Sequence, residues 1–225
     1  RDYSGSRGLG DVYKRQDYAI TDTLLVPTMI NMLVNHPDVK KYDLSSLRQI
    51  TYGASPMPES VIIKAMEVIP KCDFAHAYGM TETAPLLTIA PPDCHVFEGP
   101  KANLFKSTGL AVTGVEIKIV DDNDNELPRG EVGEVAAKGA NVMLGYWRQK
   151  ELSDKALRNG WMHTGDGGYM NDEGYVYIVD RVKDMIISGG ENIYSAEVEN
   201  AIYQLNGVIE LSLIHISEPT RPGII

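Results

Sequence analysis

The sequence predicts an α/β protein in which a parallel-sheet segment is followed by a β-rich subdomain and by the start of a small α+β domain. Three observations predict this order. Short apolar runs alternate with helical stretches between residues 24 and 78, paired strand-like runs surround polar turns between residues 107 and 182, and helical periodicity returns after residue 195. The β-rich part is expected to form a small barrel-like sheet or a sandwich.

The amino-terminal part has the alternation of strands and helices that parallel sheets require. TLLVPTMINMLVNHP predicts a short strand or turn and then a helix, with Pro27 in its first turn and Pro37 at its end. LRQITYGAS and CDFAHAY predict strands on either side of a helix in PESVIIKAMEVIP. The apolar residues of this last helix fall on one face: Val61, Ile62, Ala65, Met66 and Ile69. We therefore expect a βαβ unit with parallel strands.

The β-rich part contains two predicted hairpins, and a helix follows them. The hairpins lie in GVEIKIVDDNDNELPRGEVGEVAAKG and in WMHTGDGGYMNDEGYVYIVDR, each with polar residues where the chain would turn. SAEVENAIYQL predicts the helix, with Ser195 as its N-cap. Its apolar stripe consists of Val198, Ala201, Ile202 and Leu205.

The two ends of the chain differ from the rest. RDYSGSRGLGDVYKRQ, residues 1–16, is net basic on an acidic chain and lacks periodicity, and LSLIHISEPTRPGII, residues 211–225, breaks the pattern before it. Both stretches resemble translated sequencing-adaptor tails and are expected to be non-native, the alternative being poorly ordered native termini. The remaining divisions are expected at 17–106 for the α/β portion, 107–182 for the β-rich subdomain and 183–210 for the start of the last domain.

Composition excludes several classes of function. The 225 residues are 43% hydrophobic and 23% charged, which is ordinary for a globular protein. A formal net charge of −10 argues against a nucleic-acid partner. The two cysteines, Cys72 and Cys94, lack metal-ligand spacing and fit a reducing cytoplasm. No apolar run approaches the roughly 20 residues that span a bilayer, so we expect a soluble, cytoplasmic protein without a transmembrane segment.

Two motifs follow the predicted strands of the α/β part. YGAS, at Tyr52–Ser55, ends a strand in small residues that let a flat ligand approach the backbone, although it could be only a turn. In YGMTE, Tyr78 could stack on a base, Thr81 could contact a phosphate oxygen, and Glu82 could hold Mg²⁺. A strand end with solvated polar residues is the competing interpretation of YGMTE.

Three further motifs lie in or after the β-rich part. TGDGGY places Asp166 in a glycine-flanked turn, where its carboxylate could accept hydrogen bonds from both hydroxyls of a ribose or serve only as a turn residue. DRVKD offers Arg181 as a ligand or as a surface ion-pair partner. SGGEN could border a pantetheine arm or form a flexible turn. His163 has no recognisable nucleophile beside it, so we expect a hydrogen-bonded structural histidine.

Taken together and in order, these motifs resemble those of the adenylate-forming acid ligases. YGASPMPE, AYGMTETAP and SGGENIYSAEVE are similar to the acyl-CoA synthetases of the fatty-acid type, and the resemblance runs from about Leu24 to Glu210. It implies part of the large AMP-binding domain and the start of the small C-terminal domain. It also implies a reaction in which a carboxylic acid and ATP give an acyl-adenylate and pyrophosphate, after which the thiol of coenzyme A displaces AMP.

The resemblance also implies a role for each motif. Gly53, Ala54 and Ser55 would line the adenine slot, Tyr78 would pack on the base with Gly79 beside it, and His76 and Ala77 would face the acyl pocket. Thr81 would contact phosphate and Glu82 would hold Mg²⁺. Asp166 and Arg181 would fix the ribose, Lys183 would be the hinge of domain rotation, and Gly189 and Gly190 would border the pantetheine tunnel.

Two parts of the family's machinery are not among the 225 residues: the Ser/Thr/Gly-rich phosphate loop and a lysine of the C-terminal domain. Because both act on the charged phosphates, we expect this polypeptide by itself to be inactive. Two alternatives remain open. One is a non-catalytic β-rich interaction module, and the other is an adenylation domain that loads an amino acid or aryl acid onto a carrier protein.

Overall fold

A computed structural model describes residues 18–182, 186–188, 191–203, 205, 207–208 and 211. In chain order the elements are β1 Asp22–Leu25, α2 Pro27–Val34, β2 Gln49–Gly53, α3 Glu59–Val68, β3 Asp73–Tyr78, β4 Thr88–Ala90, β5 Leu110–Ala111, β6 Val115–Val120, β7 Gly133–Gly139, α4 Lys150–Ala156, β8 Leu157–Arg158, β9 Trp161–Met170, β10 Val176–Arg181, β11 Ile186–Ser188, β12 Glu191–Ile193 and α5 Ser195–Tyr203. Short 3₁₀ turns lie at Val39–Lys41, Thr81–Thr83, Pro92–Cys94 and Leu104–Lys106.

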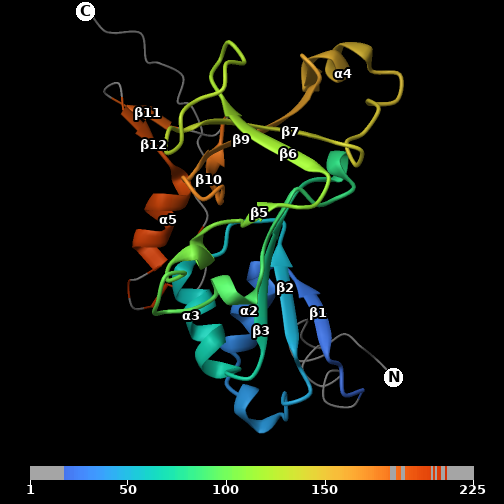
Figure 1. Cartoon of the computed structure of the whole chain (residues 1–225). Helices are drawn as coiled ribbons and strands as arrows, with labels where there is room; N and C mark the ends of the chain where they lie inside the picture. The colour runs from blue at the N-terminus through green and yellow to red at the C-terminus, as the bar shows by residue number, and fades with distance from the viewer. Residues whose placement is uncertain are drawn as a thin grey trace, which may run out of the picture.

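The first sheet has the order β1-β2-β3-β4-β5 (Figure 1). Strands β1, β2 and β3 are parallel, and β4 and β5 continue the sheet in antiparallel pairs. Parallel neighbours need a crossover connection, which α2 and α3 supply. The predicted βαβ unit is therefore confirmed, and Pro27 is the first residue of α2 as expected.

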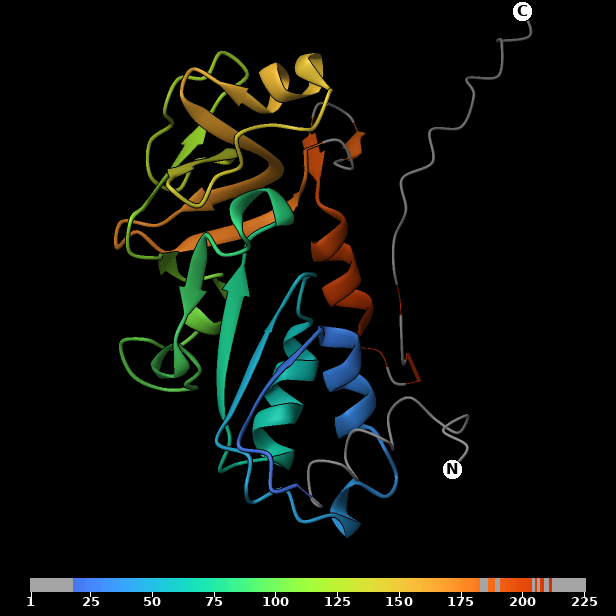
Figure 2. The same ribbon diagram turned by 90° about the vertical axis from the view of Figure 1, so that its right-hand side faces the viewer.

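One hydrophobic core lies between this sheet and its two helices. Figure 2 shows α2 and α3 together on one side of the parallel strands. Ile50, Tyr52 and Phe74 alternate along β2 and β3 with residues of the opposite face and are at most 2% exposed. The predicted face of α3 packs against them, with Val61, Ile62, Ala65 and Ile69 buried and Met66 partly buried. Periodicity alone identified this face correctly.

The second sheet is antiparallel, with the order β10-β9-β7-β6 and with β8 paired to β9. β6 and β7 form the first predicted hairpin, and β9 and β10 form the second. Figure 2 shows the long strand β9 bending through this curved sheet. The turn after β6 is closed by the Asp121 carboxylate, whose Oδ1 accepts hydrogen bonds from the backbone N–H groups of Asn123 and Asn125 at 2.9 Å each.

The last described elements are the β11-β12 hairpin and α5. α5 lies beside α3 and below β10 (Figure 1). Ser195, the predicted N-cap, is the first residue of this helix, and its backbone N–H donates to Asp180 Oδ2 at 2.7 Å. Leu205 of the predicted stripe is 61% exposed. The predicted functional residues Lys183, Gly189 and Gly190 lie outside the described residues, as do residues 1–16 and 212–225 of the expected tails.

The proposed domain boundaries stay predictions, with β5 joining the first sheet just beyond the expected boundary at residue 107. Within the described ranges, no helix combines the length and apolar character needed to cross a membrane.

Candidate functional site

The carboxyl ends of β2 and β3 lie side by side, which places two of the sequence motifs next to each other. Gly53 is paired with Ala77 in the parallel ladder. A Cβ atom on Gly53 would lie 2.1 Å from the carbonyl oxygen of Ala77, so only glycine fits there. Ala54 follows in the left-handed region at φ 71°, and the exposed Ser55 comes next. Open α/β sheets commonly bind ligands at this edge.

Tyr78, the last residue of β3, connects this edge to the second sheet. Its hydroxyl donates to Asp166 Oδ2 at 2.7 Å across 88 residues of sequence. Arg181 Nε lies 3.4 Å from Asp166 Oδ1, because Asp166 of β9 and Arg181 of β10 are register partners. Three predicted site residues from three strands thus form one contiguous chain of contacts.

Burial is the main influence on the pKa values of Asp166 and Tyr78. Burial raises the pKa of the Asp166 carboxyl above its ordinary value, while the hydrogen bond from Tyr78 and the charge of Arg181 act in the opposite direction. Burial, together with the neighbouring carboxylate, also raises the pKa of Tyr78, which keeps the phenol protonated as a donor. Arg181 is 58% exposed along its side chain, so its ion pair is substantially screened by solvent.

The segment after Tyr78 is tightly constrained. A Cβ on Gly79 would lie 1.8 Å from the carbonyl oxygen of Pro85, so a glycine is required where these two stretches cross. Asn141 Nδ2 donates to the carbonyl oxygens of Thr83 at 2.7 Å and Leu86 at 2.9 Å. These contacts fix the 3₁₀ turn Thr81–Thr83 relative to the loop that follows β7.

Within this turn, Thr81 and Glu82 remain accessible. Thr81 is exposed, and among the described residues its hydroxyl forms no hydrogen bond. Glu82 is half-buried, and its Oε1 accepts a hydrogen bond from Tyr146 Oη at 2.8 Å. That hydrogen bond raises the pKa of Tyr146. Glu82 Oε2 accepts no hydrogen bond from any residue the structure describes, which leaves it available to a ligand.

The side chains around Glu82 suit a metal ion that is bound partly by its substrate better than one that is bound by protein ligands alone. No group of three or more His, Cys, Asp or Glu side chains that could hold a metal occurs in the described part of the chain. Mg²⁺ is usually bound through one or two carboxylates together with substrate phosphates, not by an all-protein cage. A single accessible carboxylate oxygen therefore fits Mg²⁺ delivered with a nucleotide.

His76 precedes Tyr78 and points into the protein. Its ring stacks on Tyr52 at a centroid distance of 4.6 Å, and Nδ1 donates to the carbonyl oxygen of Ser107 at 3.0 Å. Burial lowers the pKa of His76 to about 4, so the imidazole is neutral at neutral pH. The predicted orientation of His76 and Ala77 toward an acyl pocket stays a prediction.

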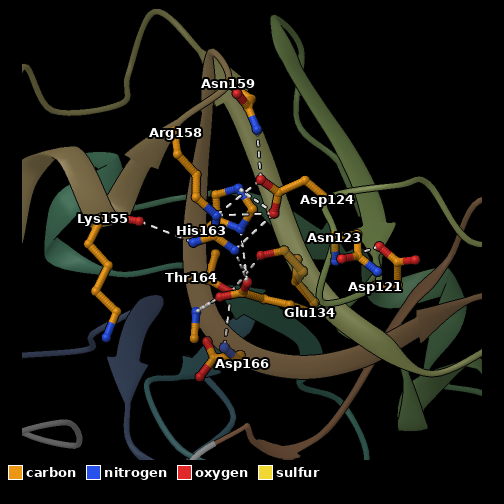
Figure 3. Close-up of polar contacts among 12 residues, drawn as sticks. Asp121, Asn123, Asp124, Glu134, Lys155, Arg158, Asn159, His163, Thr164 and Asp166 are labelled. Atoms are coloured by element: carbon orange, nitrogen blue, oxygen red, sulfur yellow. Dashed lines mark hydrogen bonds and ion pairs between the residues drawn. The ribbon is translucent and has the colours of Figure 1, made fainter.

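The expectation for His163 is confirmed. It is buried in β9, and its Nδ1 donates to Glu134 Oε2 at 2.8 Å (Figure 3). Glu134 also accepts from Arg158, whose Nη2 lies 3.1 Å from the same oxygen. The histidine is a structural, hydrogen-bonded residue within a network of charged side chains.

Tyr146, Asn141 and Glu134 were not among the residues predicted from sequence. They lie in the segments GEVGEV and KGANVMLGYW, whose side chains were assigned no role from the sequence. Tyr146 is 64 residues from Glu82 and Asn141 is 58 residues from Thr83. No local periodicity signals contacts over such separations.

Comparison with known proteins identifies the family. The sequence pattern of the AMP-binding enzymes matches residues 14–147, well over half of the chain. The chain belongs to this family. The fatty acid–[acyl-carrier-protein] ligase ScoC of Streptomyces coeruleorubidus is 39% identical over 199 residues, which cover 88% of this chain and 38% of that protein. A long-chain-fatty-acid–CoA ligase of Escherichia coli is 38% identical over 207 residues, which cover 92% of this chain and 36% of that protein.

Solved structures of adenylate-forming ligases share this fold. The amide bond synthetase of Marinactinospora thermotolerans superposes with a TM-score of 0.84 at 31% identity, covering 95% of this chain and 42% of that one. The O-succinylbenzoate coenzyme A synthetase of Bacillus subtilis, in complex with ATP and a magnesium ion, gives a TM-score of 0.73 at 34% identity, covering 87% and 39%. The predicted fold class, part of an adenylate-forming ligase, is thereby confirmed. The chain spans less than half the length of these relatives.

Proposed function

We propose that this chain is part of an ATP-dependent ligase that activates a carboxylic acid, of the fatty-acid class, as an acyl-adenylate and transfers the acyl group to the thiol of coenzyme A. The observation that carries the proposal is the contact chain from Tyr78 through Asp166 to Arg181, which joins the first sheet to the second beside Gly53. It brings motifs that are far apart in the sequence around one edge of the sheet.

The nucleotide base and sugar have complementary surroundings in this arrangement. Gly53, Ala54 and Ser55 present a side-chain-poor edge to adenine, and the ring of Tyr78 packs on the base. Asp166 accepts hydrogen bonds from the ribose hydroxyls, with Arg181 beside it. The hydroxyl of Tyr78 orients the Asp166 carboxylate through its 2.7 Å hydrogen bond, so stacking and sugar recognition are coupled through one side chain.

The phosphates lie toward the turn Thr81–Thr83 in this proposal. Thr81 would donate a hydrogen bond to a phosphate oxygen. Glu82 Oε2, which accepts no hydrogen bond from the described residues, would hold Mg²⁺, while Tyr146 donates to the other oxygen of the same carboxylate. When bound there, Mg²⁺ would supply positive charge that offsets the charge building on the leaving pyrophosphate. Tyr146 thus fixes the rotamer of the carboxylate that receives the ion.

The thiol-transfer step involves residues outside the described part of the chain. By resemblance, Lys183 is the hinge of domain rotation, and Gly189 and Gly190 border the pantetheine tunnel. A second acceptor is favoured by a specific finding, because one relative at 39% identity is named as an acyl-carrier-protein ligase. A carrier-protein thiol is therefore the alternative acceptor.

Calorimetric titration of the 225-residue chain with AMP and with a nonhydrolysable acyl-adenylate mimic tests the proposed site. Saturable binding of both is expected, whereas a non-catalytic interaction module has no reason to bind either. The acceptor is tested with the corresponding longer enzyme, by measuring acyl transfer from a panel of fatty acids to free coenzyme A and to an acyl carrier protein. Adenylation of amino acids or aryl acids but not of fatty acids would contradict the proposed acid class.

A further inference from the structure

The strand β9 is irregular where it presents Asp166. Between the register pairs Glu134–Gly167 and Ala136–His163, the single residue Val135 of β7 lies opposite Thr164, Gly165 and Asp166. Gly165 has φ 74°, in the left-handed region that favours glycine. Such a bulge re-aims a side chain but interrupts the hydrogen bonds of the ladder.

Side chains replace the interrupted hydrogen bonds. The N–H of Gly165 donates to Glu134 Oε1 at 3.0 Å. The N–H of Asp166 donates to Thr164 Oγ1 at 3.1 Å, and that hydroxyl donates in turn to the carbonyl oxygen of Val135 at 2.8 Å. On the other side, the N–H of Val182 donates to the carbonyl oxygen of Gly165 at 3.0 Å. The backbone on both sides of Gly165 is thus held by named groups.

Glu134 is itself held in place. Its Oε2 accepts from His163 Nδ1 at 2.8 Å and from Arg158 Nη2 at 3.1 Å (Figure 3). Its Oε1 remains for the N–H of Gly165. Arg158 Nη2 also lies 2.9 Å from Asp124 Oδ1, and His163 Nε2 lies 3.7 Å from the same oxygen. The Glu134 carboxylate therefore has a fixed orientation, and Asp166 is the residue immediately after Gly165, whose amide that carboxylate binds.

The geometry points to Glu134 and Thr164 as positioning residues for ribose recognition: together they hold the β9 bulge in the conformation that aims the Asp166 carboxylate at the sugar hydroxyls. This inference rests on the proposed nucleotide site. Neither residue is proposed to touch the nucleotide. Both act through the backbone of Gly165 and Asp166.

The test compares AMP with 2′,3′-dideoxy-AMP, which lacks the two hydroxyls, by calorimetric titration of the 225-residue chain. The wild-type chain should bind AMP about tenfold to a hundredfold more tightly, because hydrogen bonds to a carboxylate are made only with AMP. In Glu134→Ala and in Thr164→Val, AMP binding should weaken until this ratio falls to about twofold. Dideoxy-AMP binding should stay within about twofold of wild type, a pattern that general damage to the fold would not produce.

Two control variants accompany the test. Thr164→Ser keeps the hydroxyl and should retain the wild-type ratio. Glu116→Ala removes an exposed carboxylate of β6, which pairs only loosely with Lys138 at 3.8 Å, and should change neither affinity. If Glu134→Ala does not fold, Thr164→Val and Thr164→Ser decide the matter by themselves.

The outcomes separate the inference from the proposed function. A wild-type chain that does not bind AMP, or that binds both nucleotides equally, overturns the nucleotide site and the inference with it. A wild-type chain that discriminates, with a ratio unchanged in Thr164→Val and in a folded Glu134→Ala, overturns the positioning role alone. Equal weakening of both nucleotides in the variants also contradicts it.

Discussion

The hydrogen bond between Tyr78 and Asp166 should be measurable as a coupling free energy. Asp166 is only 13% exposed along its side chain, and the 2.7 Å hydrogen bond from Tyr78 is a close polar contact that lowers the cost of burying its carboxylate. A hydrogen bond to a charged group contributes about 1.5–3 kcal/mol. Tyr78→Phe removes this hydroxyl and keeps the aromatic ring, so the free energy of unfolding should fall by about that amount.

A double-mutant cycle isolates this interaction from other effects of the substitutions. Urea denaturation near neutral pH is measured for wild type, Tyr78→Phe, Asp166→Ala and the double variant. The two losses should be non-additive by about 1.5–3 kcal/mol. Tyr169→Phe is the matched control, because within the described residues the hydroxyl of Tyr169 forms no hydrogen bond and its ring still stacks on Tyr177. Additivity of the two losses to within about 0.5 kcal/mol would show that the two side chains do not interact and would contradict this prediction.

Three further predictions concern other parts of the site. First, because burial lowers the pKa of His76 from 6.5 to about 4, its contribution to stability is present above pH 6.5 and is lost as the pH falls toward 4. Wild type should therefore lose about 3 kcal/mol more than His76→Asn between these pH values in urea titrations, and equal losses would contradict the assignment. Second, Glu82→Gln should weaken the binding of ATP in Mg²⁺ at least about tenfold while leaving AMP binding in a chelator unchanged, so parallel losses in both titrations would exclude a metal role. Third, the 225-residue chain alone should release no pyrophosphate from ATP with any acid in a broad panel, because the phosphate loop and the C-terminal lysine that the family resemblance implies are not among its residues; robust turnover would contradict this prediction.

The sequence predicted those parts of the fold that are determined by a local pattern of apolar and polar residues. The buried face of α3 and the hairpins β6-β7 and β9-β10 are set by periodicity and by polar turns. The start of α5 shows the limit of this approach. Ser195 was predicted as the N-cap but is the first residue of the helix, and local sequence signals do not distinguish two positions that differ by one residue.

The candidate site was predicted less completely. Motif order placed Tyr78, Asp166 and Arg181 together, and the structure joins them by direct contacts. The groups that hold these residues were not predicted, because Tyr146, Asn141 and Glu134 meet their partners only after distant segments have packed. The β9 bulge depends on hydrogen bonds between a side chain and a distant backbone amide, for which the sequence carries no periodic signal.

In the proposed function, separate motifs form one nucleotide site at the carboxyl ends of β2 and β3. A structure of the chain with a nonhydrolysable acyl-adenylate mimic would locate this site. We expect adenine against the ring of Tyr78, the ribose hydroxyls on Asp166 and the phosphate near Thr81. A mimic bound on another surface, with Tyr78 and Asp166 contacting only each other, would contradict it.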